Sequence, residues 1–146
     1  MLEQLLPREA ILLNLAAGDR EAAVRAAGEL LTATGVAEPR YVDAMCDALE
    51  TLGPYCVIAP GIALPHAKPD DGVLRTGISV VTLENPVTFG HEANDPVVMV
   101  IALAPRDKEA HLAALQELAG RLDDRELLDR ISQATDVDEV YGLLVG

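Results

Sequence analysis

Basic residues are scarce in this chain. Lysine and arginine together number 11, against 24 aspartates and glutamates, so the formal net charge is −13. This balance argues against binding of nucleic acid or of an anionic membrane through a general basic patch. A basic protein is the better-matched partner, and association with it should be steered by charge and weakened by salt.

Cysteines and long apolar runs are also few. The two cysteines, Cys46 and Cys56, show no paired metal-ligand spacing, so we expect buried free thiols rather than a zinc site or a disulfide. No apolar run approaches the roughly 20 residues that a membrane helix needs, and the N-terminus lacks the positive and apolar regions of a signal peptide. These absences predict a cytoplasmic protein that does not insert into the membrane.

Motifs of several common enzyme sites are missing. No glycine-rich phosphate loop is followed by lysine, and Ser79 and Ser132 lie outside any nucleophile-elbow sequence. The three histidines, His66, His91 and His111, lack the short spacing typical of metal ligands. We therefore expect neither a nucleotide-dependent enzyme nor a serine hydrolase, and no metal or other cofactor.

The chain does contain enough apolar sequence for one core. Its 146 residues, half of them hydrophobic, predict a single domain over residues 1–146. Helical spacing predicts a helix between Asp19 and Gly35 and a second one that begins at Pro39 and stops at residues 53–54. The inner face of the second helix is predicted to carry Val42, Met45, Leu49 and Leu52.

Short apolar runs between glycines and prolines predict strands at residues 10–15, 56–58, 62–64, 76–83 and 97–103. The last run is apolar without alternation, as in a central strand with helices on both faces. Three helices should follow, beginning near Asp107, at residues 123–124 and at residues 135–138, where Thr135 would start a capping box. The first should bury Leu112, Leu115, Ala119 and Leu122. This order predicts an α/β fold, a mixed β-sheet sandwiched between helices.

His66 ends the sequence Gly-Ile-Ala-Leu-Pro-His at residues 61–66. Pro65 fixes its own φ and biases Leu64 toward the extended region, so the strand should stop where the ring is presented. Imidazole transfers protons and accepts phosphoryl groups near neutral pH. We therefore expect His66 to be the reactive residue.

His111 is the second candidate. It lies about one turn into the helix that Asp107 should cap, at the edge of the apolar stripe. The helix dipole there disfavours imidazolium and suits a neutral hydrogen-bond donor beside an anion. A half-buried histidine bonded only by the backbone is an alternative that stays open. His91, in the polar turn of residues 89–96, is expected to be a solvated loop residue.

Residues 55–69, from Tyr-Cys-Val-Ile-Ala-Pro-Gly to Leu-Pro-His-Ala-Lys-Pro, resemble the active-site segment of the IIA (EIIA) proteins of the bacterial sugar phosphotransferase system (PTS). The similarity is to the fructose and mannitol superfamily, and within it to the ascorbate-type branch. The resemblance runs from about Asp19 to the C-terminus. Further matching residues occur in the family's order, at residues 53–55, 72, 76–77, 94–97 and 107–111.

This resemblance implies a type-2 EIIA fold and a phosphotransferase with a covalent phosphohistidine intermediate. His66 would accept the phosphoryl group on Nε2 from the histidine-containing carrier protein HPr. It would pass the group to a cysteine of an EIIB partner, which serves an EIIC membrane permease, both on separate chains. His111 matches the family's second histidine and would donate a hydrogen bond to the phosphoryl oxygens.

One position departs from the pattern. Mannitol and fructose members usually carry an arginine in the second helix, whereas this sequence has Ala48, and the ascorbate-type branch does without that arginine. Backbone N–H groups around Ala67 and Lys68, or the charges of Lys68 and Arg75, are further candidates for holding the phosphoryl group, although solvated loop cations are the simpler account of both side chains.

The resemblance leaves two biological roles open. One is sugar uptake, for which the residues do not identify the sugar beyond a lean toward ascorbate. The other is a regulatory EIIA-like protein that signals its phosphorylation state by binding an enzyme or a transcription regulator.

Overall fold

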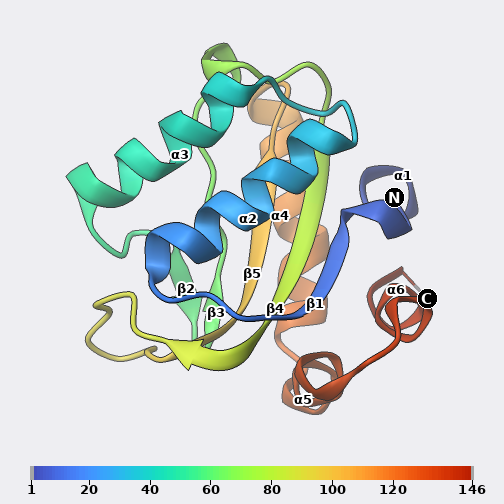
Figure 1. Cartoon of the computed structure of the whole chain (residues 1–146). Coiled ribbons are helices and arrows are strands. Elements are labelled where there is room, and N and C mark those ends of the chain that lie inside the picture. Colours follow the sequence, from blue (N-terminus) through green and yellow to red (C-terminus); the bar gives the residue numbers. More distant parts are fainter. Residues whose placement is uncertain (1, 146) are drawn as a thin grey trace.

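A five-stranded mixed sheet forms the centre of the protein in the computed structural model, which describes residues 2–145 (Figure 1). The strand order is β1-β4-β5-β3-β2. β1 is parallel to β4 and β3 is parallel to β5, whereas the β4–β5 and β2–β3 pairs are antiparallel. The strands are β1 (Ile11–Leu15), β2 (Val57–Ala59), β3 (Ile62–Ala63), β4 (Gly77–Val87) and β5 (Val97–Ala104).

Helices cover both faces of the sheet. α2 and α3 pack on one face, and α4, α5 and α6 pack on the other (Figure 1). The α-helices are α1 (Leu2–Leu5), α2 (Arg20–Ala33), α3 (Pro39–Leu52), α4 (Lys108–Leu122), α5 (Arg125–Gln133) and α6 (Val137–Val145), with 3₁₀ helices η1 (Arg8–Ala10) and η2 (Pro69–Asp71). The predicted α/β sandwich is confirmed. None of the helices within residues 2–145 combines the length and the apolar character that crossing a membrane requires.

β5 sends buried side chains to both faces of the sheet, which explains its unbroken apolar sequence. Ile101 and Leu103 belong to the cluster shared with α4, α5 and α6, whereas Val100 and Ala102 belong to the cluster beneath α2 and α3. Because both faces are covered, β5 is the central strand that the sequence predicted.

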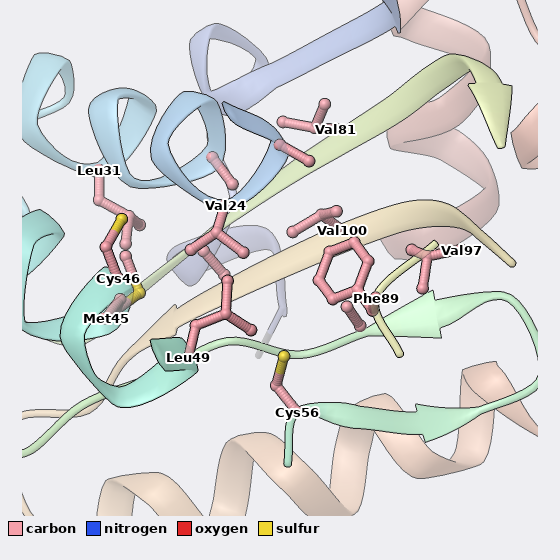
Figure 2. Packing of buried hydrophobic residues seen from close by; sticks show 14 of the residues in the cluster. Val24, Leu31, Met45, Cys46, Leu49, Cys56, Val81, Phe89, Val97 and Val100 are labelled. Atoms are coloured by element: carbon pink, nitrogen blue, oxygen red, sulfur yellow. The ribbon is translucent and has the colours of Figure 1, made fainter. Parts of the chain in front are cut away.

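Both cysteines belong to the cluster beneath α2 and α3. Figure 2 shows Cys46 on α3 and Cys56 before β2, with Leu49 packed in the same cluster. The two thiols are free and buried, as expected. Burial raises the pKa of Cys46 and raises that of Cys56 to about 11, so both remain protonated at neutral pH and act as packing residues.

Helix ends follow most of the predicted signals. Carboxylate oxygens of Asp19, Asp107 and Asp124 accept hydrogen bonds from backbone N–H groups three residues later, at 2.8, 2.7 and 3.1 Å. Gly35 follows α2 with a φ of 75°, the left-handed conformation that favours glycine after a helix. At α6 the predicted capping residue, Thr135, was wrong. Asp136 caps the helix instead, since its Oδ1 accepts a hydrogen bond from Asp138 N–H at 2.9 Å.

Two predicted helical faces need correction. Leu52, at the end of α3, is 64% exposed because the chain turns away from the core there. In α4 the buried residues are Ala114, Leu118 and Leu122, whereas Leu112 is 62% exposed. Apolar residues occur on several sides of this helix, and docking on the sheet selects the stripe that begins at His111.

Candidate functional site

His66 lies just beyond β3, where the chain leaves the sheet beside the carboxyl end of β5. Leu103 N–H donates to Pro65 O at 3.0 Å, and Leu64 N–H donates to Cys56 O at 2.7 Å. The segment is therefore bonded to the chain on both sides up to the residue before His66. The side chain of His66 is partly buried, so its ring stands at the end of a rigid strand and still reaches the surface.

The ring of His66 is oriented by its own backbone. Nδ1 lies 3.0 Å from Leu64 O. A carbonyl oxygen only accepts hydrogen bonds, so this contact requires the proton on Nδ1 and, in the neutral ring, leaves the lone pair on Nε2. In this tautomer Nε2, on the far side of the ring from that contact, is a neutral nucleophile.

Two tyrosines hold the backbone around the ring. The Tyr55 hydroxyl donates to His66 O at 2.6 Å, and the two rings meet edge to face with centroids 5.7 Å apart. The buried Tyr41 hydroxyl donates to Leu103 O at 2.6 Å and accepts from Ala67 N–H at 2.9 Å. Burial raises the pKa of both phenols, so each keeps its proton at neutral pH. Tyr41 was not predicted from the sequence, because a tyrosine on the inner face of a helix has the pattern of a packing residue.

His111 faces His66 from the first turn of α4. The ring centroids are 5.0 Å apart and the ring planes are inclined by 82°. His111 N–H donates to Asp107 O at 3.0 Å, and the buried Ala114 and Leu118 follow His111 on the same side of the helix. The structure therefore brings the two predicted site residues into contact.

The pKa of His111 is lowered from its ordinary value. The larger cause is burial, which removes water from the ring, and the smaller is repulsion by a charge on the neighbouring His66. The folded protein therefore holds His111 in the neutral form more readily than the unfolded chain does. A neutral imidazole has one N–H donor and one lone pair, so it can donate a hydrogen bond to an anion.

We expect an NMR titration to place the transition of His111 at lower pH than in a free peptide. In His66→Gln the transition should move to higher pH, because the repelling charge is gone. The unfolded chain binds this proton more readily than the folded protein, so the natural chain should lose stability as the pH falls from about 7 to about 5. His111→Gln lacks the titrating ring and should lose less stability over the same range. His91→Gln is the control and should leave the His111 curve in place. An unchanged His111 curve in His66→Gln would contradict the electrostatic contact.

The other predicted candidates are engaged elsewhere or exposed. Ala67 N–H donates to the Tyr41 hydroxyl and Lys68 N–H donates to Asp71 Oδ2 at 3.0 Å, so the two amides expected to be available for a phosphoryl group are occupied. Arg75 donates to a backbone carbonyl at the end of α2 at 2.8 Å, which assigns its charge to that helix end. The Lys68 side chain is exposed.

His91 lies in the loop before β5, as expected, but it is half-buried and its ring is engaged in hydrogen bonds. Its Nδ1 accepts hydrogen bonds from Ala93 N–H at 3.1 Å and Asn94 N–H at 3.0 Å, and its own N–H donates to Asp95 Oδ2 at 3.1 Å. The ring thus closes the turn before β5, as a side-chain oxygen does in an Asx turn. The other two histidines lie beyond the opposite end of β5. Within residues 2–145, no group of three or more His, Cys, Asp or Glu side chains is arranged to hold a metal ion.

The two histidine rings lie outside the groove between α2 and α3. That groove has a volume of about 450 Å³, and neither His66 nor His111 lines it. The site instead stands at the end of the sheet, where His66 is only partly buried. An open site of this kind fits a reacting group carried on another protein better than a small molecule that needs an enclosing pocket.

Comparison with known proteins relates this geometry to a family. A family model described as "Phosphoenolpyruvate-dependent sugar phosphotransferase system, EIIA 2" matches residues 4–145. The ascorbate-specific PTS system EIIA component of Escherichia coli (strain K12) is 38% identical over 143 residues, which are 97% of this chain and 93% of that protein. The similarity therefore extends over nearly the whole chain.

Solved structures agree with this relationship. In the complex of enzyme IIAMTL and phosphorylated enzyme IIBMTL from Escherichia coli, the similar chain has a TM-score of 0.86 at 38% identity and covers 97% of this chain and 99% of that chain. A putative PTS IIA (PtxA) from Streptococcus mutans has a TM-score of 0.87 at 31% identity, and the match covers 94% of this chain and 89% of that protein. The predicted α/β fold, observed over residues 2–145, is the fold of these proteins.

Proposed function

Because this chain belongs to the EIIA 2 family of the phosphoenolpyruvate-dependent sugar phosphotransferase system, we propose that it is a phosphocarrier whose acceptor is His66. The donor is the phosphohistidine of HPr, and the receiver is a cysteine of an EIIB partner that serves an EIIC permease. The protein works in the cytoplasm, where these exchanges take place between freely diffusing proteins.

One observation carries this proposal, the contact of 3.0 Å between His66 Nδ1 and Leu64 O. It favours the tautomer in which Nε2 is unprotonated. When Nε2 attacks phosphorus, a new N–P bond forms, the N–P bond of the donor histidine breaks, and no proton has to leave His66. In the second step a cysteine thiolate attacks phosphorus, the S–P bond forms, and His66 leaves as neutral imidazole.

His111 is the proposed stabiliser of the phosphoryl group. Phosphoryl transfer through a loose transition state depends mainly on positioning and on stabilising charge at the phosphoryl oxygens. The His111 ring, with its centroid 5.0 Å from that of His66, can donate one hydrogen bond to such an oxygen. Ala48 supplies no charge from α3, and within residues 2–145 no hydrogen bond or ion pair brings a lysine or arginine to either ring.

Similarity to the solved complex supports EIIB as the receiving partner. In that complex an EIIA protein of 38% identity is bound to phosphorylated enzyme IIBMTL. The net charge of −13 supports a basic docking surface on the partner, and Leu112, 62% exposed one residue after His111, offers an apolar contact beside the site. Both features suit a complex that forms quickly and dissociates after transfer.

Ascorbate is the substrate that we propose for the whole system. Curated relatives at 38% identity are named as ascorbate-specific, but the mannitol protein of the solved complex is equally identical, so identity alone does not choose between them. The residue that favours ascorbate is Ala48, which replaces the arginine usual in mannitol and fructose members. The choice of substrate therefore depends on which EIIB accepts the phosphoryl group.

The decisive experiment follows the phosphoryl group by intact mass. The chain is incubated with phosphoenolpyruvate, enzyme I and HPr, and should gain one acid-labile phosphoryl group. Ascorbate-type and mannitol-type EIIB are then added separately, each with its Cys→Ser control, and we expect transfer to the ascorbate-type cysteine only. Phosphorylation without transfer to either EIIB would support the regulatory role. No phosphorylation beside an HPr shown to be active would refute the phosphocarrier proposal.

A further inference from the structure

The Tyr41 hydroxyl stands between the carboxyl end of β5 and the segment that carries His66. Leu103 of β5 is in parallel register with this segment, since Leu103 N–H donates to Pro65 O at 3.0 Å. In a regular parallel ladder, Leu103 O would next accept from Ala67 N–H. Instead, Ala67 N–H donates to the Tyr41 hydroxyl at 2.9 Å, and that hydroxyl donates to Leu103 O at 2.6 Å.

We propose that Tyr41 is a positioning residue for the phosphoryl acceptor. Its hydroxyl replaces one hydrogen bond of the parallel ladder and so holds the chain after His66 apart from β5. The separation lets the strand end where the ring must meet a partner, while Ala67 N–H and Leu103 O both remain hydrogen-bonded. This inference rests on the proposed function of His66 as the acceptor.

The surroundings of Tyr41 suit this role. α3 begins at Pro39, so Tyr41 lies in the first turn of the helix, and its side chain is fully buried in the cluster beneath α2 and α3. A phenol has one proton to donate, and Leu103 O takes it at 2.6 Å. The lone pairs then accept from Ala67 N–H, so donor and acceptor match on both sides. A buried pair of matched bonds fixes geometry more firmly than a solvated one.

Tyr55 fixes the same segment from a different element. Its hydroxyl donates to His66 O at 2.6 Å, and His66 N–H points to the same oxygen at 3.4 Å. The carbonyl of His66 and the amide of Ala67 belong to the same peptide unit, and each is bonded to a tyrosine from a separate part of the chain. That peptide unit is therefore held at both its polar groups, and Leu64 O holds the ring itself.

Tyr41→Phe removes the inserted hydroxyl and keeps the packed ring. Either Ala67 N–H then bonds directly to Leu103 O, which draws His66 toward β5, or both groups stay buried without a partner. Both responses move or loosen the peptide unit after His66. Because a displacement of about 1 Å can slow a reaction by about 100-fold, we expect kcat for transfer from phosphorylated HPr to fall at least about tenfold. KM for HPr should change less than about twofold, since no docking side chain is altered.

The test compares the rates of phosphorylation of the natural chain, Tyr41→Phe and Tyr141→Phe over a range of phosphorylated HPr concentrations, after circular dichroism and thermal unfolding show that each variant is folded. Tyr141→Phe removes the same oxygen atom from α6, away from the site. The Tyr141 ring centroid lies 4.0 Å from Arg8 Cζ. We expect the natural rate in Tyr141→Phe and the lowered kcat in Tyr41→Phe. A readout that a merely structural role would not move is the ¹⁵N chemical shift of the His66 ring, which should report a loss of the Nδ1-protonated tautomer only in Tyr41→Phe.

Each outcome decides the inference. If the natural chain is phosphorylated on His66 and Tyr41→Phe keeps its kcat and its ring ¹⁵N shifts, the role of Tyr41 is refuted while the proposed function stands. If the natural chain is not phosphorylated on His66, both fall. If Tyr41→Phe does not fold, NMR of the natural chain decides. A slowly exchanging Tyr41 hydroxyl proton close to the Ala67 amide supports the insertion, and its absence refutes it.

Discussion

Replacing His66 with glutamine will abolish phosphorylation by HPr. Glutamine has a similar reach and can donate a hydrogen bond, but it has no nucleophilic nitrogen and therefore cannot form the N–P bond. We expect intact mass spectrometry to find no phosphoryl group on His66→Gln under conditions in which the natural chain is fully modified. The effect is all or none because the covalent intermediate depends on a single atom.

The matched control for this experiment is His91→Gln. It makes the same chemical change at the turn before β5, at the opposite end of the strand from the site, so phosphorylation should proceed at the natural rate. A phosphoryl group retained by His66→Gln and mapped by fragmentation to His111 would show that the two rings have been assigned the wrong roles.

Replacing His111 with alanine will leave His66 able to accept the phosphoryl group but will slow its transfer onward. Removal of one donor that stabilises developing charge typically costs about 100-fold or more in rate, and no arginine stands at residue 48 to compensate. His111→Gln should fall between alanine and the natural residue, because its amide can still donate a hydrogen bond. Transfer is measured by quenched-flow with phosphorylated protein and EIIB.

Phosphorylation should also change the titration of His111. In the free protein its pKa is lowered by burial and by His66. Two negative charges on the phosphoryl group oppose both effects, so the pKa of His111 should rise when His66 is phosphorylated. An NMR titration of both forms measures this change. Onward transfer at the natural rate in His111→Ala, or a His111 curve that does not move on phosphorylation, would exclude the proposed contact.

The places of His66 and His111 in the fold were predictable, because both carry local signals. Pro65 precedes one of them at the end of an apolar run, and Asp107 stands four residues before the other as a helix cap. The spacing of the two histidines in the sequence does not predict their contact, which only the family resemblance suggested. The contact arises because β3 and β5 are parallel, so that His66, after β3, and α4, after β5, lie at the same end of the sheet.

Tyr41 had no comparable signal in the sequence. Its hydroxyl bonds Leu103, which is 62 residues away, and this contact exists only once α3, β3 and β5 are aligned. The stripe of α4 was misread for a related reason. Apolar residues such as Leu112 occur around much of that helix, so periodicity alone leaves the inner face undecided until the sheet selects it.

The site spans the boundary between the two layers of the protein. The tyrosines that hold His66 pack with the cluster beneath α2 and α3, whereas His111 stands on α4, which packs against the opposite face of the sheet. The distance between the two rings therefore depends on the thickness of the sheet together with the side chains packed on its two faces. A substitution that changes the volume of a buried β5 side chain should therefore change the rate of the proposed transfer, although that side chain touches neither ring.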